Sequence, residues 1–322
     1  MRFVTIASAA VLALAPFTSA LADDSSADDL LKAIKKARLI DLSHTWDEKS
    51  PIAIVNPTYS FKLEATHANT RGTFGDDGQL SFTSEVMHFS GQHGAPSIDA
   101  IGHIGRDGLL FGKVDAAAST SSLDGIGRSG VGAELAIDRF PTDLLINRGV
   151  LLDVATWFAQ KNHKPHPNTA LLPADHEITA SDLELTAKHQ GVKLKKGDTV
   201  FIRTGWGPFF KSDPDKYAGA FSPGPSLDGA EFLISHGARV VGDDTLTFEK
   251  RPPIVTAPKF QVFPVHMRLI ADKGIFIIEN LNLEELASAK AYEFAVVVPP
   301  LRILGGTGSA LRVFALVPRD DD

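Results

Sequence analysis

No cysteine occurs among the 322 residues, which excludes disulfides, thiolate metal ligands and cysteine nucleophiles. Beyond the first 22 residues, charged residues interrupt every apolar stretch before it reaches the roughly 18 residues of a membrane-spanning helix. The formal net charge is −7 and both signs are interspersed, so no basic surface for nucleic acid is indicated. These absences favour a soluble protein that binds neither nucleic acid nor membrane.

Residues 1–22 have the pattern of a secretory signal. Arg2 supplies a positive start, residues 4–17 form an apolar stretch, and Ala20-Leu21-Ala22 is a small-x-small cleavage site. We therefore expect a secreted or periplasmic protein whose residues 23–322 form a single domain. A chain of this length buries a core without covalent cross-links.

The remaining segments predict a mixed α/β fold. Strands are predicted over residues 39–44, 148–155, 238–244 and 311–317, and a turn leads into a strand over 197–206. The apolar runs within 148–155 and 238–244 are typical of strands buried on both faces. Capped, periodic segments predict helices over residues 25–38, 178–191 and 226–237, and helix, strand and short helix in turn over 266–287. In the first half of the chain the patterns predict strands and loops, and residues 56–92 give only weak secondary-structure signals. No clean doubly wound sheet is therefore expected.

Several patterns point to other functions and are set aside. GIGRSG (125–130), with Asp153 downstream, matches a dinucleotide fingerprint, but no strand precedes it. GGTGSA (305–310) is followed by a strand rather than a helix, which favours a tight turn over a phosphate cradle. The sequence contains no G-x-S-x-G nucleophile elbow, which weakens the interpretation as a serine hydrolase. His163 and His166 lie in a proline-rich loop, where surface histidines are common.

The stretch HGAPSIDAIGH places His93, Asp99 and His103 within eleven residues. In an extended strand, His93 would lie roughly 20 Å from Asp99. That separation is too large for two ligands of one ion, each of which lies about 2 Å from the metal. Residues 94–96 and Gly102 allow the chain to fold back, but a polar surface loop would use the same residues, so the stretch alone leaves both interpretations open.

Eight segments together resemble the cyclase family, which includes bacterial kynurenine formamidase and isatin hydrolase. In order they are IDLSH, HGAPSIDAIGH, GVLLDVA, ITASDLE, GDTVFIRTGW, VVGDDT, H-x12-E and GGTGSALR, and they cover nearly all of residues 23–322. The resemblance implies a swivelling β/β/α fold and a homo-oligomer, commonly a dimer. The family signature H-x-G-T-H-x-D-x-P-x-H maps onto residues 93–103. Carried over by position, it implies the metal ligands His93, Asp99, His266 and Glu279, and His103 as the catalytic proton carrier.

The chain departs from that signature at a ligand position. Ser97 stands where the family has its second His, Ala95-Pro96 replaces Gly-Thr, and Ile101 replaces Pro. A serine hydroxyl is a poorer ligand than imidazole for a divalent transition metal. The site therefore either holds an ion through the four remaining ligands, lets water fill the gap, or binds metal weakly.

Each residue also has a purely structural interpretation. His266 caps a helix, Asp99 belongs to a turn, His103 is a partly buried hydrogen bonder, and Glu279 pairs with Arg268 or Arg302. The joint order of the residues favours the ligand interpretation.

The resemblance implies a hydrolase, dependent on Zn²⁺ or Mn²⁺, that cleaves a C–N bond in a formamide or cyclic amide. N-formylkynurenine, the arylformamidase substrate of tryptophan catabolism, is the first named candidate. An exported lactonase of the same family and a non-catalytic binding protein that has lost its metal are the alternatives.

Overall fold

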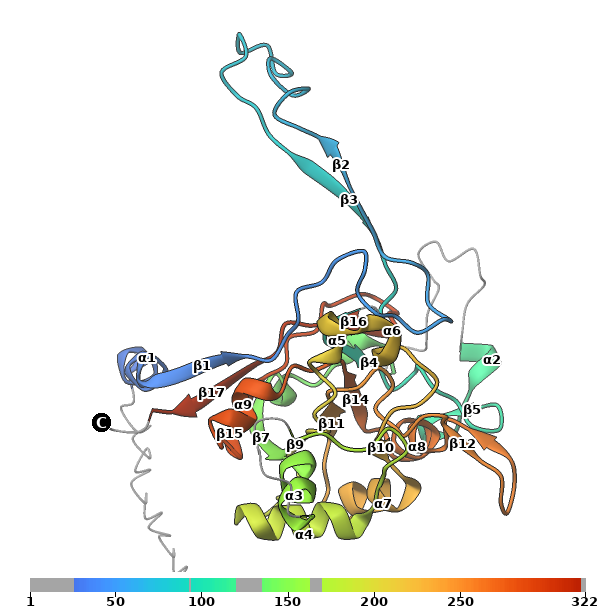
Figure 1. Ribbon diagram of the computed structural model, residues 1–322. Coiled ribbons are helices and arrows are strands. Elements are labelled where there is room, and N and C mark those ends of the chain that lie inside the picture. Colours follow the sequence, from blue (N-terminus) through green and yellow to red (C-terminus); the bar gives the residue numbers. More distant parts are fainter. Residues whose placement is uncertain (1–25, 93, 120–134, 163–169, 320–322) are drawn as a thin grey trace, which may run out of the picture. The chain divides into compact units, whose positions relative to one another are not determined.

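A computed structural model of the protein describes residues 26–92, 94–119, 135–162 and 170–319 (Figure 1). The chain divides into two compact units, one ending at Lys36 and one starting at Ala37. Residues 1–22 lie outside the described ranges, so the signal sequence stays a prediction, as does a single domain over 23–322. Among the described residues, no helix has both the length and the apolarity that a bilayer crossing requires.

The first unit contains helix α1 (Ala27–Lys36), which is two residues shorter at each end than the sequence predicts. Asp28 and Asp29 occupy its first turn, where carboxylates stabilise the helix dipole. The Ser26 hydroxyl accepts a hydrogen bond from the backbone N–H of Asp29 and so caps the helix.

The second unit is built on a nine-stranded mixed sheet with the order β1-β17-β15-β7-β9-β11-β14-β4-β16. These strands are β1 (Ala37–Asp41), β4 (Ser97–Asp99), β7 (Ile146–Leu152), β9 (Thr199–Ile202), β11 (Val240–Asp243), β14 (Phe276–Glu279), β15 (Glu293–Val297), β16 (Gly308–Ala310) and β17 (Phe314–Pro318). The predicted mixed α/β class is confirmed.

The four central strands β7, β9, β11 and β14 are parallel neighbours. Each coincides with a predicted strand, because a strand covered on both faces needs an unbroken apolar run. Helices α3 (Val154–Lys161), α4 (Ala180–Gln190) and α7 (Leu227–Ser235) connect these strands and lie together along the sheet (Figure 1).

Helix α4 begins and ends as the sequence predicts. The Thr179 hydroxyl accepts from the backbone N–H of Asp182, whose carboxylate accepts from the N–H of Thr179 in return. Gly191 ends the helix with φ 70°, in the left-handed region that glycine enters without strain.

Two hydrophobic cores cover opposite faces of the sheet. One contains alternate strand residues such as Val150, Val200 and Val241 together with the inner side chains of α3, α4 and α7. The other contains Leu151 and Phe201, packed against residues 135–145 and 281–287. Burying one such side chain contributes roughly 1.5–3 kcal/mol of stability, so both layers hold the C-terminal edge of the parallel strands in place.

Beyond the central strands, the sequence predicts less. Strand β15, the short strand β4 and the edge strand β16 were not expected, and GGTGSA contains β16 itself rather than only preceding a strand. Residues 56–92 contain a hairpin of β2 (Ser60–Ala65) and β3 (Ser84–His88). The remaining strands and α-helices of the described residues are β5 (Leu109–Leu110), β6 (Val114–Asp115), α2 (Ala116–Ser119), β8 (Glu177–Ile178), α5 (Phe209–Ser212), α6 (Pro214–Tyr217), β10 (Gly224–Pro225), β12 (Ile254–Val255), β13 (Gln261–Val262), α8 (Pro264–His266) and α9 (Glu284–Ser288). A π-helix, Met267–Ala271, directly follows α8.

Candidate metal centre

The end of β14 and the short strand β4 place two carboxylates on one face of the sheet. The strands pair antiparallel, with Ile277 opposite Asp99 and Glu279 opposite Ser97. Directly opposite residues point to the same face, and so do residues two apart on one strand. Ser97, Asp99 and Glu279 therefore share a face, although nearly 180 residues separate the two strands.

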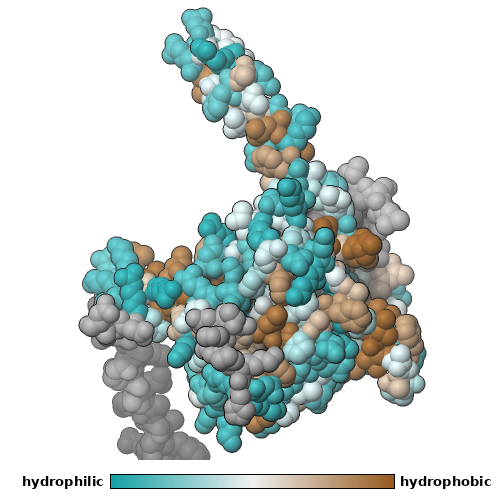
Figure 2. Space-filling view, in the orientation of Figure 1, coloured by the Kyte–Doolittle hydropathy of each residue, from teal (hydrophilic) through white to brown (hydrophobic). Residues whose placement is uncertain are grey.

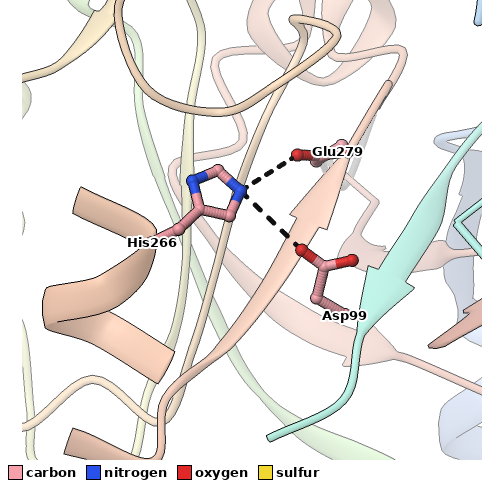
Figure 3. A group of neighbouring side chains, drawn as sticks. All are labelled: Asp99, His266 and Glu279. Carbon is pink, nitrogen blue, oxygen red and sulfur yellow. Dashed lines mark hydrogen bonds and ion pairs between the residues drawn. The ribbon is translucent and has the colours of Figure 1, made fainter. Parts of the chain in front are cut away.

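His266 completes a cluster with these carboxylates. Its Nε2 lies 3.3 Å from Oε1 of Glu279 and 3.7 Å from Oδ2 of Asp99 (Figure 3). One potential ligand atom from each residue lies within 4.8 Å of the others. The side chains of Asp99 and His266 are each 3% exposed and that of Glu279 is 12% exposed, so the cluster is largely shielded from water.

Asp99, Glu279 and His266 do not have the non-ligand roles that the sequence also allowed for them. Asp99 lies in a buried strand rather than in a turn. Arg268 pairs with Glu231 and Asp272 instead of with Glu279. His266 ends the short helix α8 with its ring turned toward the carboxylates (Figure 3).

Glu249 orients the His266 ring, a role that the sequence did not reveal. Its Oε1 lies 2.6 Å from Nδ1 of His266, and its carboxylate also accepts the backbone N–H groups of Val265 and His266. A carboxylate that accepts these bonds keeps the proton on Nδ1 and leaves the Nε2 lone pair for the cluster. Metal-ligating histidines are typically held in this way.

We expect Glu249→Gln to weaken Mn²⁺ binding by roughly 10–100-fold, since loss of such an orienting partner typically costs that much. Isothermal titration of the purified protein with Mn²⁺ measures the change. Glu184→Gln, at an exposed position on α4, serves as the control and should leave the affinity unchanged. Equal affinities for wild type and Glu249→Gln would remove Glu249 from the site.

The cluster carries more negative charge than its surroundings neutralise. Burial, and then the charge of Asp99, raise the pKa of Glu279 from 4.5 to about 7. Burial alone would lower the pKa of His266, but hydrogen bonds to Glu249 and Glu279 outweigh it and raise that pKa well above its ordinary value. Both shifts indicate a site that favours added positive charge.

This charge imbalance predicts a pH dependence of stability in the metal-free protein. The folded pKa of Glu279 lies above its unfolded value, so its stabilising contribution is full below about pH 4.5 and is lost as the pH rises through about 7. The raised pKa of His266 acts in the same direction. In EDTA, we expect Tm to fall by roughly 4–8 °C between pH 5 and pH 8.

Glu279→Gln, which removes the titrating carboxyl, should flatten much of that fall. Differential scanning calorimetry at several pH values measures both proteins. A wild-type Tm that rises over the same interval would contradict the assigned charge balance.

His103 lies next to the cluster on a turn after β4. Its backbone N–H donates to the carbonyl of Ala100, which is the bend predicted near Gly102. Its Nε2 lies 3.9 Å from Oδ1 of Asp99, and Nε2 of Gln92 lies 3.3 Å from its Nδ1. The His103 side chain is 30% exposed, so it can meet both the cluster and an incoming molecule.

His93 lies outside the described residues, and its predicted role as a ligand stays a prediction. The residue after it is fixed to the site, because the side-chain amide of Asn280 donates to the carbonyl of Gly94. Asn280 directly follows Glu279 and also contacts the Tyr217 hydroxyl. The segment entering β4 is thus tied to the end of β14.

The donor set fits a divalent cation. Asp99 and Glu279 offer oxygens and His266 a nitrogen, the ligand types found at Zn²⁺ and Mn²⁺ sites. Ser97 is 1% exposed, and its hydroxyl has no hydrogen-bond partner within the described part of the chain. It lies at the predicted ligand position, opposite Glu279.

The Cyclase family model matches residues 40–250, which is more than half of the chain. The chain belongs to the cyclase family. Isatin hydrolase from Roseibium aggregatum is 28% identical over 181 residues, which are 52% of this chain and 63% of that protein. The match thus spans less than two thirds of that relative's length.

Solved structures share the fold over nearly the whole chain. A structure described as a novel cyclase covers 90% of this chain and 93% of its own, with a TM-score of 0.71 and 26% identity. Isatin hydrolase A from Labrenzia aggregata, solved with benzyl benzoate bound, covers 91% of this chain and 99% of its own, with a TM-score of 0.65 and 20% identity. The predicted family resemblance is confirmed.

A small pocket in this cyclase-family chain reaches Glu279. Its apolar lining residues include Trp46, Ile52, Ala53 and Leu246, and the others are Pro51, Asn56, Gln92, Gly94, Glu279 and Asn280. Trp46 stacks on Tyr59 with ring centroids 4.4 Å apart and meets Phe89 edge-on at 5.3 Å.

The patterns set aside gain no support as sites in the cyclase-family fold. Asp153 caps α3 and forms an ion pair with Arg203 at 2.9 Å, with both side chains 3% exposed. It is therefore a structural residue rather than a ribose ligand. Residues 125–130, His163 and His166 lie outside the described ranges.

Proposed function

We propose that this protein is a metal-dependent hydrolase that cleaves the C–N bond of an amide. Asp99, His266 and Glu279, with His93, would hold one divalent cation. The observation that carries this function is the buried cluster in which His266 points its Nε2 at two carboxylates while Glu249 holds its other nitrogen. A merely structural histidine would not need three acidic side chains around it.

A divalent cation bound in such a site lowers the pKa of water toward about 7 and polarises the substrate carbonyl. In the overall reaction, a water oxygen adds to the carbonyl carbon, the C–N bond breaks, and the leaving nitrogen takes up a proton. His103 is placed to deliver that proton, because it stands beside Asp99 and remains partly exposed. An imidazole, whose ordinary pKa is about 6.5, suits proton transfer near neutral pH.

The substrate class is proposed from the pocket and the relatives. Trp46 and Leu246 place apolar side chains beside Glu279, where the aromatic part of a substrate would pack. The relative from Roseibium aggregatum is named an isatin hydrolase, and isatin is a cyclic aromatic amide. We therefore place an isatin-like lactam first and an aryl formamide such as N-formylkynurenine second.

The metal is proposed from the ligands. Because Ser97 replaces a histidine, oxygen donors outnumber nitrogen donors among the described residues. Oxygen-rich sites favour Mn²⁺ more than nitrogen-rich sites do, so we propose Mn²⁺ ahead of Zn²⁺.

The test is an assay of the purified protein with Mn²⁺ or Zn²⁺ on isatin, an aryl formamide and an aryl lactone. We expect amide hydrolysis that EDTA abolishes and added metal restores. Activity on the lactone alone would replace the amide with an ester substrate. No turnover of any substrate, by protein that contains the metal, would overturn the proposal.

A second candidate function is that of a binding protein that has lost its metal. It is favoured by Ser97, which stands where the family signature has a histidine ligand. In that case the protein should retain no Mn²⁺ or Zn²⁺ after reconstitution, but should still bind an aromatic amide. Elemental analysis together with ligand titration separates the two functions.

A further inference from the structure

Ser97 lies beside the candidate metal ligands in a fixed position. Its strand β4 has a neighbour on each side, so Ser97 is opposite Glu279 of β14 and also opposite Ala310 of β16. Directly opposite residues have Cβ atoms about 4.5–5.5 Å apart on a common face, so the Ser97 side chain points to the same side as Glu279. Ser97 is 1% exposed, which places its hydroxyl in the interior with the ligands.

The Ser97 hydroxyl has no partner there. Its Oγ forms no hydrogen bond within the described ranges of the chain, and so none to the carboxylates of Asp99 or Glu279. A buried hydroxyl without a partner destabilises a protein, and such an atom commonly marks the place of a bound water or ion. Polar groups that are more than about 3.5 Å apart are often bridged by water.

Ser97 is too short to replace a histidine as a direct ligand. The imidazole nitrogens of a histidine lie three or four bonds from Cα, whereas the serine oxygen lies two bonds from it. Ligand atoms lie about 2 Å from a divalent cation, and a hydrogen bond to water adds about 2.8 Å. Because β4 is paired on both sides, its backbone is not free to move toward a cation and make up the difference.

We propose that Ser97 holds a water molecule that takes the place of the missing imidazole. Oγ of Ser97 hydrogen-bonds to this water, and the water, rather than the hydroxyl, occupies the ligand position of the family histidine. The role rests on the proposed metal-dependent function and adds a cause for the choice of metal. Exchanging an imidazole for water replaces a nitrogen donor by an oxygen donor, which favours Mn²⁺ over Zn²⁺.

A bridging water differs from the two other roles open to Ser97. If the hydroxyl is itself a ligand, its removal opens a position on the cation that a further water fills. If the change from histidine to serine abolishes the site, the protein binds no cation. With a bridging water, removal of the hydroxyl leaves the number of waters on the cation unchanged.

Ser97→Ala is the least disruptive test, because it removes only the hydroxyl. We expect the affinity for Mn²⁺, measured by isothermal titration, to fall by less than about 10-fold, the contribution of one hydrogen bond. The relaxation rate of solvent protons rises with the number of waters bound to Mn²⁺. In the Mn²⁺-loaded variant this rate should match that of the wild type.

Ser97→His tests the same position by restoring the imidazole. It should displace the bridging water, so the solvent-proton relaxation rate of the Mn²⁺-loaded variant should correspond to one bound water fewer. Its affinity for Zn²⁺ should rise relative to Mn²⁺ by roughly 10-fold or more, because imidazole suits Zn²⁺ better than water does. Thermal melting confirms that it is folded. If it is not, Ser97→Ala decides alone.

Ser181→His is the matched control for an added imidazole. Ser181 is exposed on α4, where Figure 2 shows a mostly hydrophilic surface. The variant should keep the wild-type number of bound waters and the wild-type ratio of Zn²⁺ to Mn²⁺ affinity.

The measurements separate the role of Ser97 from the proposed hydrolysis, because they need Mn²⁺ but no substrate. One more bound water in Ser97→Ala, with a loss of affinity above about 10-fold, would make the hydroxyl a ligand and overturn the role of Ser97 alone. An unchanged number of bound waters in folded, Mn²⁺-loaded Ser97→His would overturn it as well. A wild type that binds no Mn²⁺ would defeat both this role and the proposed function.

Discussion

The double substitution His266→Gln with Glu249→Gln is expected to lower the affinity for Mn²⁺ by roughly 100-fold or more, which exceeds the effect of losing the orienting partner alone. His266 supplies the nitrogen of the cluster, and its Nε2 is the atom nearest to both carboxylates. Replacing it removes the donor that brings Asp99 and Glu279 to a common centre. Glu249 is replaced as well because a buried carboxylate left without its partner would destabilise the fold.

Isothermal titration measures the affinity, and circular dichroism of the metal-free variant confirms its fold. His189→Gln, on the exposed side of α4, is the matched control and should bind Mn²⁺ like the wild type. A folded double variant that still binds one Mn²⁺ per chain with wild-type affinity would show that the cation is held elsewhere.

His103→Ala is expected to lower kcat by about 10²–10⁴, the usual contribution of a positioned general acid or base. Its Nδ1 faces Gln92 and its Nε2 lies 3.9 Å from Asp99, so the ring is oriented without belonging to the cluster of Asp99, His266 and Glu279. The dissociation constant for Mn²⁺ should therefore stay close to that of the wild type. Steady-state kinetics on the hydrolysed amide, with a parallel metal titration, measures both quantities.

A variant at an exposed histidine, His236→Gln, controls for loss of an imidazole in general. Full activity of His103→Ala would exclude the proton-transfer role. A loss of activity that parallels a loss of metal would reassign His103 as a ligand.

The parallel strands at the centre of the sheet could be predicted from the sequence. The ranges 148–155 and 238–244 contain the unbroken apolar runs 150–152 and 240–242, because β7 and β11 are covered on both faces. The short strand β4, between β14 and β16, was not predicted as a strand, since three residues that include Ser97 and Asp99 carry no apolar run. Its pairing with β14 comes from tertiary structure, and local sequence does not encode it.

The residues of the candidate site also divide into those that the sequence identifies and those that only the tertiary structure identifies. Asp99, His266 and Glu279 could be named because they stand in a motif order, and the structure brings these three together. Glu249 could not be named, because its role arises from one 2.6 Å contact with His266 and from no spacing in the chain. Gln92 and Asn280 were missed for the same reason, since their contacts join segments far apart in sequence.

The most direct measurement is an anomalous diffraction map from crystals of the protein soaked in Mn²⁺. We predict one strong peak per chain, within bonding distance of Asp99, His266 and Glu279 at the end of β14. A peak bound by other residues, or a map with no peak in crystals shown to contain manganese, would contradict the claim that strands from opposite ends of the chain close around one cation.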